Sequence, residues 1–286
     1  MMNKIVMMAL CLFAFLSLKA TGLSGDMINI KGEEWVLLAK PINEDSLLYV
    51  RLMDFLPENR YSSTANWDGY TAYWKIENGN LYLQHIDVYL HNETRDTSWV
   101  KVFSPDDLKD VFASYYRGGK IYASWFSGQV RAGQGEQLIY IHSGFYRRYE
   151  AEQVITVENG RVLSMQLYHN YKKDGLKMES LYSEVVKCFP WQQFPEYREC
   201  KLYFTTHSYE VTPEGRLTDC YANVYIQPTG EKINDANHPL IKTFKEILKS
   251  IYPLEVFFIN GKFILMYDNY TFPISVEKTK EANTKS

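Results

Sequence analysis

The chain has 286 residues, of which 46% are hydrophobic and 23% charged, and its net charge is −3. This length allows one large domain or two ordinary ones, and the composition is that of a globular protein rather than a disordered one. A charge so close to neutral excludes the broad basic field that nucleic-acid binding requires. Aromatic residues make up 15% of the chain and include 23 tyrosines. Such a composition is typical of β-sheets and of surfaces that stack on ligands.

The first segment has the pattern of an export signal. Lys4 provides a short charged start, an apolar run over 5–18 follows, and small residues occur near 22–24. A signal peptidase recognises this arrangement. We therefore expect residues 1–24 to be a signal peptide, cleaved after Ser24 or Ala20. The protein is then exported to the periplasm or cell envelope, with release to the medium as the less favoured outcome.

An uncleaved membrane anchor is the alternative for this segment. The apolar run is short for a transmembrane helix, which needs about 20 residues. No later segment has the composition of a membrane span. We therefore expect no membrane span after cleavage.

Residues 25–184 are expected to form a strand-rich domain. Short strands are expected at 35–39 and 47–53, and a hairpin at 70–76 and 81–90, joined by Asn78-Gly79. Asn-Gly between such runs is the strongest short hairpin signal. Further strands are expected at 99–103, 120–130 and 137–142, with a second hairpin at 152–157 and 161–168. One helix is expected to begin at Ser104, because Ser104 and Asp107 have the spacing of a capping box, and to end at Arg117-Gly118-Gly119. Its expected apolar face consists of Leu108, Val111, Phe112 and Tyr115.

A second domain is expected at 185–278, around one amphipathic helix and one hairpin. Apolar residues over 240–251 fall on a single stripe of a 3.6-residue helix, with Asn237 as the expected N-cap and Pro253 ending the segment. The runs at 256–259 and 263–267 are joined by Asn260-Gly261, a third hairpin signal. The charged and polar residues 279–286 are expected to be a disordered tail.

The cysteines bear on the redox state of an exported protein. Cys11 lies in the expected signal segment, which leaves Cys188, Cys200 and Cys220 for an oxidising compartment. The odd number leaves at least one thiol unpaired within a monomer. A Cys188–Cys200 disulfide is preferred, because it closes a short segment that has no periodicity of its own. A Cys200–Cys220 bridge is less favoured, and three free thiols are the remaining alternative.

The end of the chain carries a more specific pattern. The turn Glu214-Gly215, the helix at 240–251, Asn260-Gly261-Lys262 and the closing Tyr270-Thr271-Phe272-Pro273-Ile274 follow one another in this order. In this the last third of the chain resembles the TonB C-terminal domain family. The resemblance implies an α+β protein with a small ββαββ domain, from a Gram-negative envelope of the Bacteroidota kind. It also implies capture of a partner strand at a sheet edge, for which the candidate residues are Tyr270, Thr271 and Phe272.

No motif for catalysis stands out. The six histidines form no H-E-x-x-H pair, no G-x-S-x-G elbow occurs, and the cysteines lack zinc spacing. We expect no catalytic residues, no metal and no cofactor, and an enzyme is the less favoured class.

Aromatic side chains are the best ligand-binding candidates in the first domain. Two predicted loop tips, at 67–70 and 145–149, concentrate them, and loop tips often carry function. The simpler interpretation is that most of these side chains are core and cross-strand pairs. The candidate set is Trp67, Tyr70, Trp74, Trp125, Phe145, Tyr146 and Tyr149.

Two functions follow from these observations. The leading one is an exported, non-catalytic binding or scaffold protein that captures an envelope protein or peptide strand by β-augmentation. The alternative is a carbohydrate-binding or glycan-hydrolysing envelope protein that uses the aromatic loops of the first domain. An open strand edge favours the first, and two carboxyl groups about 5–10 Å apart beside tryptophans favour the second.

Overall fold

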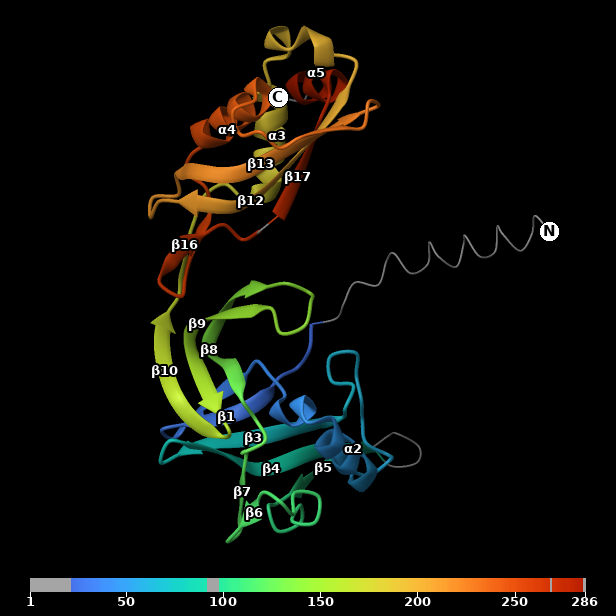
Figure 1. Ribbon diagram of the computed structural model, residues 1–286, viewed down its shortest axis with the longest axis vertical. Helices are drawn as coiled ribbons and strands as arrows, with labels where there is room; N and C mark the ends of the chain where they lie inside the picture. Colours follow the sequence, from blue (N-terminus) through green and yellow to red (C-terminus); the bar gives the residue numbers. More distant parts are fainter. Residues whose placement is uncertain (1–21, 92–97, 268, 285–286) are drawn as a thin grey trace, which may run out of the picture. The chain divides into compact units, whose positions relative to one another are not determined.

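The structure, a computed structural model, describes residues 22–91, 98–267 and 269–284 (Figure 1). The chain divides into two compact units, Met1–Tyr168 and His169–Ser286. Both units combine helices with mainly antiparallel strands, so the described residues have an α+β fold. No helix among them is long and apolar enough to cross a membrane. The expected signal segment lies outside the described residues up to position 21.

The boundary between the units falls earlier than the expected position after residue 184. The strand β11 (Tyr171–Lys173) pairs with β15 (Val256–Ile259), which is far along in the C-terminal unit. The helix α3 (Met178–Cys188) buries Leu181 and Val185 in the core of the same unit. These tertiary contacts assign residues 169–184 to the C-terminal unit.

One ten-stranded sheet forms the framework of the N-terminal unit. Its strands are β1 (Asp26–Ile30), β2 (Glu33–Leu37), β3 (Tyr70–Glu77), β4 (Asn80–His91), β5 (Ser98–Phe103), β6 (Tyr116–Arg117), β7 (Lys120–Tyr122), β8 (Gly128–Tyr140), β9 (Arg147–Glu158) and β10 (Arg161–His169). The 3₁₀-helix η2 (Pro41–Glu44) and the helix α2 (Ser46–Phe55) lie between β2 and β3 in the chain.

The strands of this sheet curve back on themselves. Their order is β10-β9-β8-β2-β1-β3-β4-β7-β6, with β5 also on β4. Besides its neighbour β9, strand β10 also pairs with β4, where Arg161 lies opposite Asn80. This pairing joins the first strand of the order to β4 and closes the sheet between them. The bend of the long strands β8, β9 and β10 is visible in Figure 1. The enclosed core contains the largest fully buried side chains of the unit, Trp74, Tyr70 and Phe112.

The three hairpins predicted from Asn-Gly pairs are confirmed. They join β3 to β4, β9 to β10, and β15 to β16 (Lys262–Ile264). In each pair both residues have positive φ, between 47° and 51° for the asparagine and between 74° and 79° for the glycine. This is the type I′ conformation, whose twist matches that of the flanking strands. Lys31 and Gly32 form a similar turn between β1 and β2, without the asparagine that would have predicted it.

The strand expected at 47–53 is wrong, because this segment belongs to α2. Asp45 caps the helix, and its Oδ1 accepts hydrogen bonds from the backbone N–H groups of Leu47 and Leu48, both at 3.0 Å. Leu48 and Leu52 are fully buried. A separation of four residues places both side chains on the same face of a helix.

The helix expected from Ser104 is also wrong, because 105–115 is a series of turns. The capping box does form: Asp107 Oδ2 accepts from Ser104 N at 2.8 Å, and Asp107 N donates to Ser104 Oγ at 3.4 Å. Beyond it, four-residue hydrogen bonds run from Phe112 N to Leu108 O and from Tyr116 N to Phe112 O, and a three-residue bond runs from Tyr115 N to Phe112 O. This mixture gives turns rather than a regular helix. Of the apolar residues predicted for the helix, Leu108, Val111 and Phe112 are buried and Tyr115 is half-buried.

The C-terminal unit contains two antiparallel sheets. The larger has the order β14-β13-β12-β17 and consists of β12 (Lys201–Val211), β13 (Leu217–Gln227), β14 (Glu231–Ile233) and β17 (Asn269–Ile274). The smaller has the order β11-β15-β16. The hairpin at Asn260-Gly261 therefore joins β11 rather than the four-stranded sheet. The described helices of this unit are α3, α4 (Pro239–Ser250) and α5 (Val276–Thr284), with 3₁₀-helices η3 (Trp191–Gln193) and η4 (Pro195–Tyr197).

Helix α4 matches the predicted amphipathic stripe. Leu240, Ile241, Phe244 and Leu248 are its buried residues, and the helix packs on β13 (Figure 1). The Phe244 ring stacks on Phe204 at 4.2 Å between centroids and meets Phe272 edge-on at 5.3 Å. The N-cap is His238 rather than the expected Asn237, because His238 Nδ1 accepts from Leu240 N.

The disordered tail expected at 279–286 is wrong for residues 279–284, which belong to α5. Thr279 Oγ1 accepts a hydrogen bond from Trp191 Nε1 at 2.9 Å and donates to the carbonyl of Val186 at 3.0 Å. Ala282 packs against the core of the unit. Side chains distant in sequence thus hold a segment whose composition alone predicts disorder.

Candidate functional site

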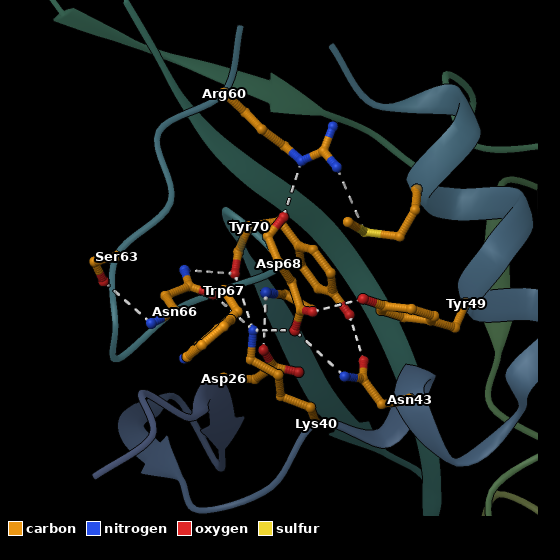
Figure 2. Close-up of polar contacts among 12 residues, drawn as sticks. Asp26, Lys40, Asn43, Tyr49, Arg60, Ser63, Asn66, Trp67, Asp68 and Tyr70 are labelled. Atoms are coloured by element: carbon orange, nitrogen blue, oxygen red, sulfur yellow. Dashed lines mark hydrogen bonds and ion pairs between the residues drawn. The ribbon is translucent and has the colours of Figure 1, made fainter. Parts of the chain in front are cut away.

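A cluster of polar side chains from several elements of the N-terminal unit is joined by hydrogen bonds (Figure 2). Separate elements supply its members: β1 begins with Asp26, Lys40 lies between β2 and η2, Asn43 is in η2, Tyr49 is in α2, and Asp68 precedes β3. Long-range folding therefore brings these residues together.

Lys40 is the centre of the cluster. Its side chain is only 9% exposed and its Nζ is 2.8 Å from Asp68 Oδ2. The same ammonium donates to Asn66 Oδ1 at 2.8 Å and to the Tyr70 carbonyl at 3.4 Å (Figure 2). An ammonium has three N–H donors. All three are used within the protein, so Lys40 stabilises the cluster and has no donor left for a ligand.

Asp68 accepts several hydrogen bonds at once. Besides Lys40, its carboxylate accepts from Tyr49 Oη at 2.8 Å and from Asn43 Nδ2 at 3.3 Å. Burial alone would raise the pKa of Asp68, but the hydrogen bond and charge of Lys40, with the bonds from Tyr49 and Asn43, hold this pKa below its ordinary value. Burial and the contact with Asp68 raise the pKa of Tyr49. Asp68 is therefore ionised near neutral pH, as an acceptor rather than a general base.

Asp26 is the second carboxyl group and is fully buried. Its Oδ1 accepts from Ala72 N at 3.2 Å, and its Oδ2 accepts from Trp74 Nε1 at 2.9 Å. Burial raises the pKa of Asp26 to about 7, although the charge of Lys40 acts in the opposite direction. Burial and the negative charges of Asp26 and Asp68 also raise the pKa of Tyr70. Asp26 thus belongs to the interior of the unit and is not among the residues that line the adjacent pocket.

A pocket of about 240 Å³ adjoins this cluster. It is lined by Leu23, Lys40, Asn43, Glu44, Ala65, Asn66, Trp67, Asp68 and Phe145. The Trp67 side chain is 72% exposed, and its Nε1 donates to the Thr64 carbonyl at 2.6 Å. The pocket therefore combines fixed polar groups with an exposed aromatic ring. No group of three or more potential metal ligands occurs among the residues that the structure describes.

The structure brings part of the predicted aromatic set together. Trp67 and Phe145 both line the pocket, while Tyr70 lies beneath it, where its Oη donates to Asn43 Oδ1 at 2.8 Å. Trp74 and Trp125 belong to the core, 6.1 Å apart between centroids. Trp74 is fully buried and Trp125 is partly buried against the same core, and neither lines the pocket.

The last two predicted residues lie outside the pocket lining. The guanidinium of Arg148 lies 6.0 Å from the ring of Tyr146. The Tyr149 ring covers Gly133, where a Cβ would come within 2.2 Å of Tyr149 Cδ2. Sequence reasoning missed Lys40, Asn43 and Asp68 as site residues. The only signal was the position of Asp68 next to Trp67 in a predicted loop tip.

The candidate partner edge lies in the C-terminal unit, on β17. This strand is an outer strand of its sheet, and β12 is its only strand neighbour among the described residues. Pro273 has no N–H that could be donated to β12, so we expect it at a position whose backbone groups point away from that strand. The Pro273 carbonyl does face away, because it accepts a hydrogen bond from Tyr182 Oη of α3 at 2.9 Å. The N–H and C=O groups of successive residues point alternately to the two sides of a strand. Those of Thr271 and Asn269 therefore also point away from β12.

The side chains of the predicted edge residues differ in environment. Thr271 is exposed, Tyr270 is half-buried, and Phe272 is completely buried against Phe244. A partner at this edge therefore meets the backbone and Thr271, while Phe272 anchors the strand in the core.

The described cysteines are free thiols, so the expected Cys188–Cys200 bridge is not formed. Cys188 ends α3 and is exposed, whereas Cys200 packs against the core of the unit. Cys220 is buried in β13, and burial raises its pKa to about 11. A thiol with so high a pKa is a poor nucleophile.

Comparisons with known proteins find no matching family model, no matching curated protein and no matching solved structure. The function is therefore inferred from the geometry of these sites.

Proposed function

We propose that this chain is an exported, non-catalytic binding protein of the cell envelope that captures an extended partner segment at the outer edge of β17. The observation that carries this proposal is the outward-facing backbone at Thr271 and Asn269, on a strand whose only described strand neighbour lies on its other side. An open strand edge is a template for a further strand, and main-chain hydrogen bonds then supply affinity.

The core of the C-terminal unit supports such a role by holding β17 rigid. Phe272 and Ile274 are buried, and the strand pairs with β12 from Asn269 to Ile274. A pre-organised edge loses little conformational freedom when it binds, which favours affinity. The resemblance of the chain's last third to the TonB C-terminal domain family supports the same proposal.

Export of the protein to the cell envelope is part of the proposal. The apolar run and small residues at the start of the chain support export to the envelope. Residues 22–24 belong to the folded N-terminal unit: Leu23 N donates to the Gly144 carbonyl and Ser24 N to the Ala65 carbonyl, both at 2.7 Å. Cleavage after Ser24 would remove these contacts, so we propose cleavage after Ala20.

A pair of substitutions at one position tests strand capture. Thr271→Pro removes the outward N–H, whereas Thr271→Ala removes the side chain and keeps the N–H. Random peptides are selected on the full chain from a displayed library, and the affinity of the selected peptides is measured for each variant. Since a hydrogen bond contributes about 0.5–1.5 kcal/mol, Thr271→Pro should weaken binding by roughly threefold to tenfold, and Thr271→Ala should leave it unchanged.

Matched folding controls make this result interpretable. Thr271→Pro should keep the melting temperature of the unit, since Pro273 already occupies an equivalent position two residues later. Tyr270→Pro should lower it, because the Tyr270 backbone faces β12. Equal loss of binding in Thr271→Ala and Thr271→Pro would refute backbone recognition.

A further inference from the structure

The pocket beside the Lys40 cluster has walls that backbone hydrogen bonds hold in place. Segment 23–24 is hydrogen-bonded to two other segments of the pocket lining. Leu23 N donates to the Gly144 carbonyl, next to Phe145, and Ser24 N donates to the Ala65 carbonyl. The segment that contains Ala65 and Asn66 is itself held as a turn, because Asn66 and Ser63 exchange two backbone hydrogen bonds of 3.0 and 3.1 Å. The pocket is therefore formed without a ligand, as binding sites usually are.

Two aromatic side chains flank this pocket. The Trp67 ring is exposed, yet its hydrogen bond to the Thr64 carbonyl fixes its orientation. Phe145 is half-buried, and its carbonyl accepts a hydrogen bond from Arg131 Nη2 at 3.1 Å. An exposed indole that is held in one orientation provides a flat apolar surface for stacking.

The polar groups of the pocket suit hydroxyl groups. The Asp68 carboxylate has about four acceptor positions. Lys40, Tyr49 and Asn43 use three of them, which leaves one. The Asn43 amide has a second N–H beyond the one given to Asp68, and the exposed Glu44 adds carboxylate acceptors. A hydroxyl group both donates and accepts, so a polyhydroxyl ligand matches this mixed set.

Charge and size narrow the class of ligand. An anion is disfavoured, because every N–H of Lys40 is used internally and the other charged groups of the lining are the carboxylates of Glu44 and Asp68. The volume of about 240 Å³ is smaller than the roughly 300–1,000 Å³ of pockets for drug-sized ligands. A ligand unit the size of one sugar ring fits these limits.

We propose that this pocket binds one neutral sugar residue, stacked by its C–H face on Trp67 and hydrogen-bonded through its hydroxyl groups to Asn43, Asp68 and Glu44. The site belongs to the N-terminal unit and is independent of strand capture at β17. It adds a second binding activity to the chain.

Titration of the full chain with a panel of neutral methyl glycosides tests this proposal. Saturation-transfer NMR detects the bound glycoside, and tryptophan emission follows occupancy. Trp67→Ala should weaken binding by about tenfold, and Trp67→Phe, which keeps a stacking ring, should weaken it less. Trp99→Ala is the matched control, because Trp99 is also an exposed tryptophan of this unit but does not line the pocket.

Several outcomes would overturn the proposal. These are the absence of binding by any glycoside at about 10 mM, equal affinity of wild type and Trp67→Ala, and equal losses in Trp67→Ala and Trp99→Ala. Binding of inorganic phosphate in place of glycosides would also refute it. Unchanged melting temperatures show that the variants fold. Thr271→Pro should bind glycosides like wild type, so failure of strand capture and failure of sugar binding are distinguishable.

Discussion

Asp26 makes the stability of the N-terminal unit depend on pH in an unusual direction. Its carboxyl group is fully buried, and its pKa is raised from 3.8 to about 7. Between these values the folded protein keeps a proton that the unfolded chain has released. The contribution of Asp26 to the free energy of unfolding therefore falls as the pH rises through this window, and this contribution is constant above and below it.

The size of this effect follows from the shift. A difference of about three pKa units corresponds to about 4 kcal/mol at 1.36 kcal/mol per unit. Asp26→Asn cannot ionise, so the difference in unfolding free energy between variant and wild type should rise by about 3 kcal/mol from pH 4 to pH 7, which is most of the full effect. The loss of a good acceptor for Trp74 Nε1 adds an offset that does not change with pH.

Urea unfolding at a series of pH values measures this difference. Tryptophan emission reports mainly on the N-terminal unit, because five of the six tryptophans lie in it. Asp68→Asn is the control of opposite sign. The folded-state pKa of Asp68 is lowered, so its contribution is present above the unfolded value of 3.8 and is lost as the pH falls through the lower folded value. Parallel curves for wild type and Asp26→Asn between pH 4 and 7 would refute this account.

The remaining predictions concern the C-terminal unit. Phe244→Ala should destabilise this unit by about 3–5 kcal/mol, because Phe244 is fully buried against Phe204 and Phe272. Circular dichroism in denaturant measures this loss, and a loss below about 1 kcal/mol would contradict the packing. In the native protein a thiol reagent should modify Cys188 rapidly and Cys220 only after unfolding, since Cys188 is exposed and Cys220 is buried with a raised pKa. Peptide mapping that finds Cys220 modified first would contradict this order.

Local signals in the sequence predicted several elements correctly. The three Asn-Gly hairpins and helix α4 formed where they were expected. Positive φ at an asparagine and a glycine, and an apolar stripe with a 3.6-residue period, depend on neighbours only a few residues away. Such features can be recognised without knowledge of the fold.

Other segments were decided by distant contacts. Residues 47–53 have a composition that suits a strand, but Asp45 caps them as a helix and the core buries Leu48 and Leu52. The segment from 279 to 284 is polar, yet the contacts of Thr279 with Trp191 and Val186 attach it to the unit. Propensity is a weak preference that tertiary packing overrides.

The sequence by itself determined that the chain is globular, near neutral and aromatic-rich, and it placed Trp67 and Phe145 in loops. Only the tertiary structure brought these two side chains to one pocket and set Lys40, Asn43 and Asp68 beside them, from segments up to 28 residues apart. It also placed β17 at the outer position of its sheet. The physical reason is that strand order and polar clusters depend on long-range pairing, and the residues concerned carry no local pattern that specifies it.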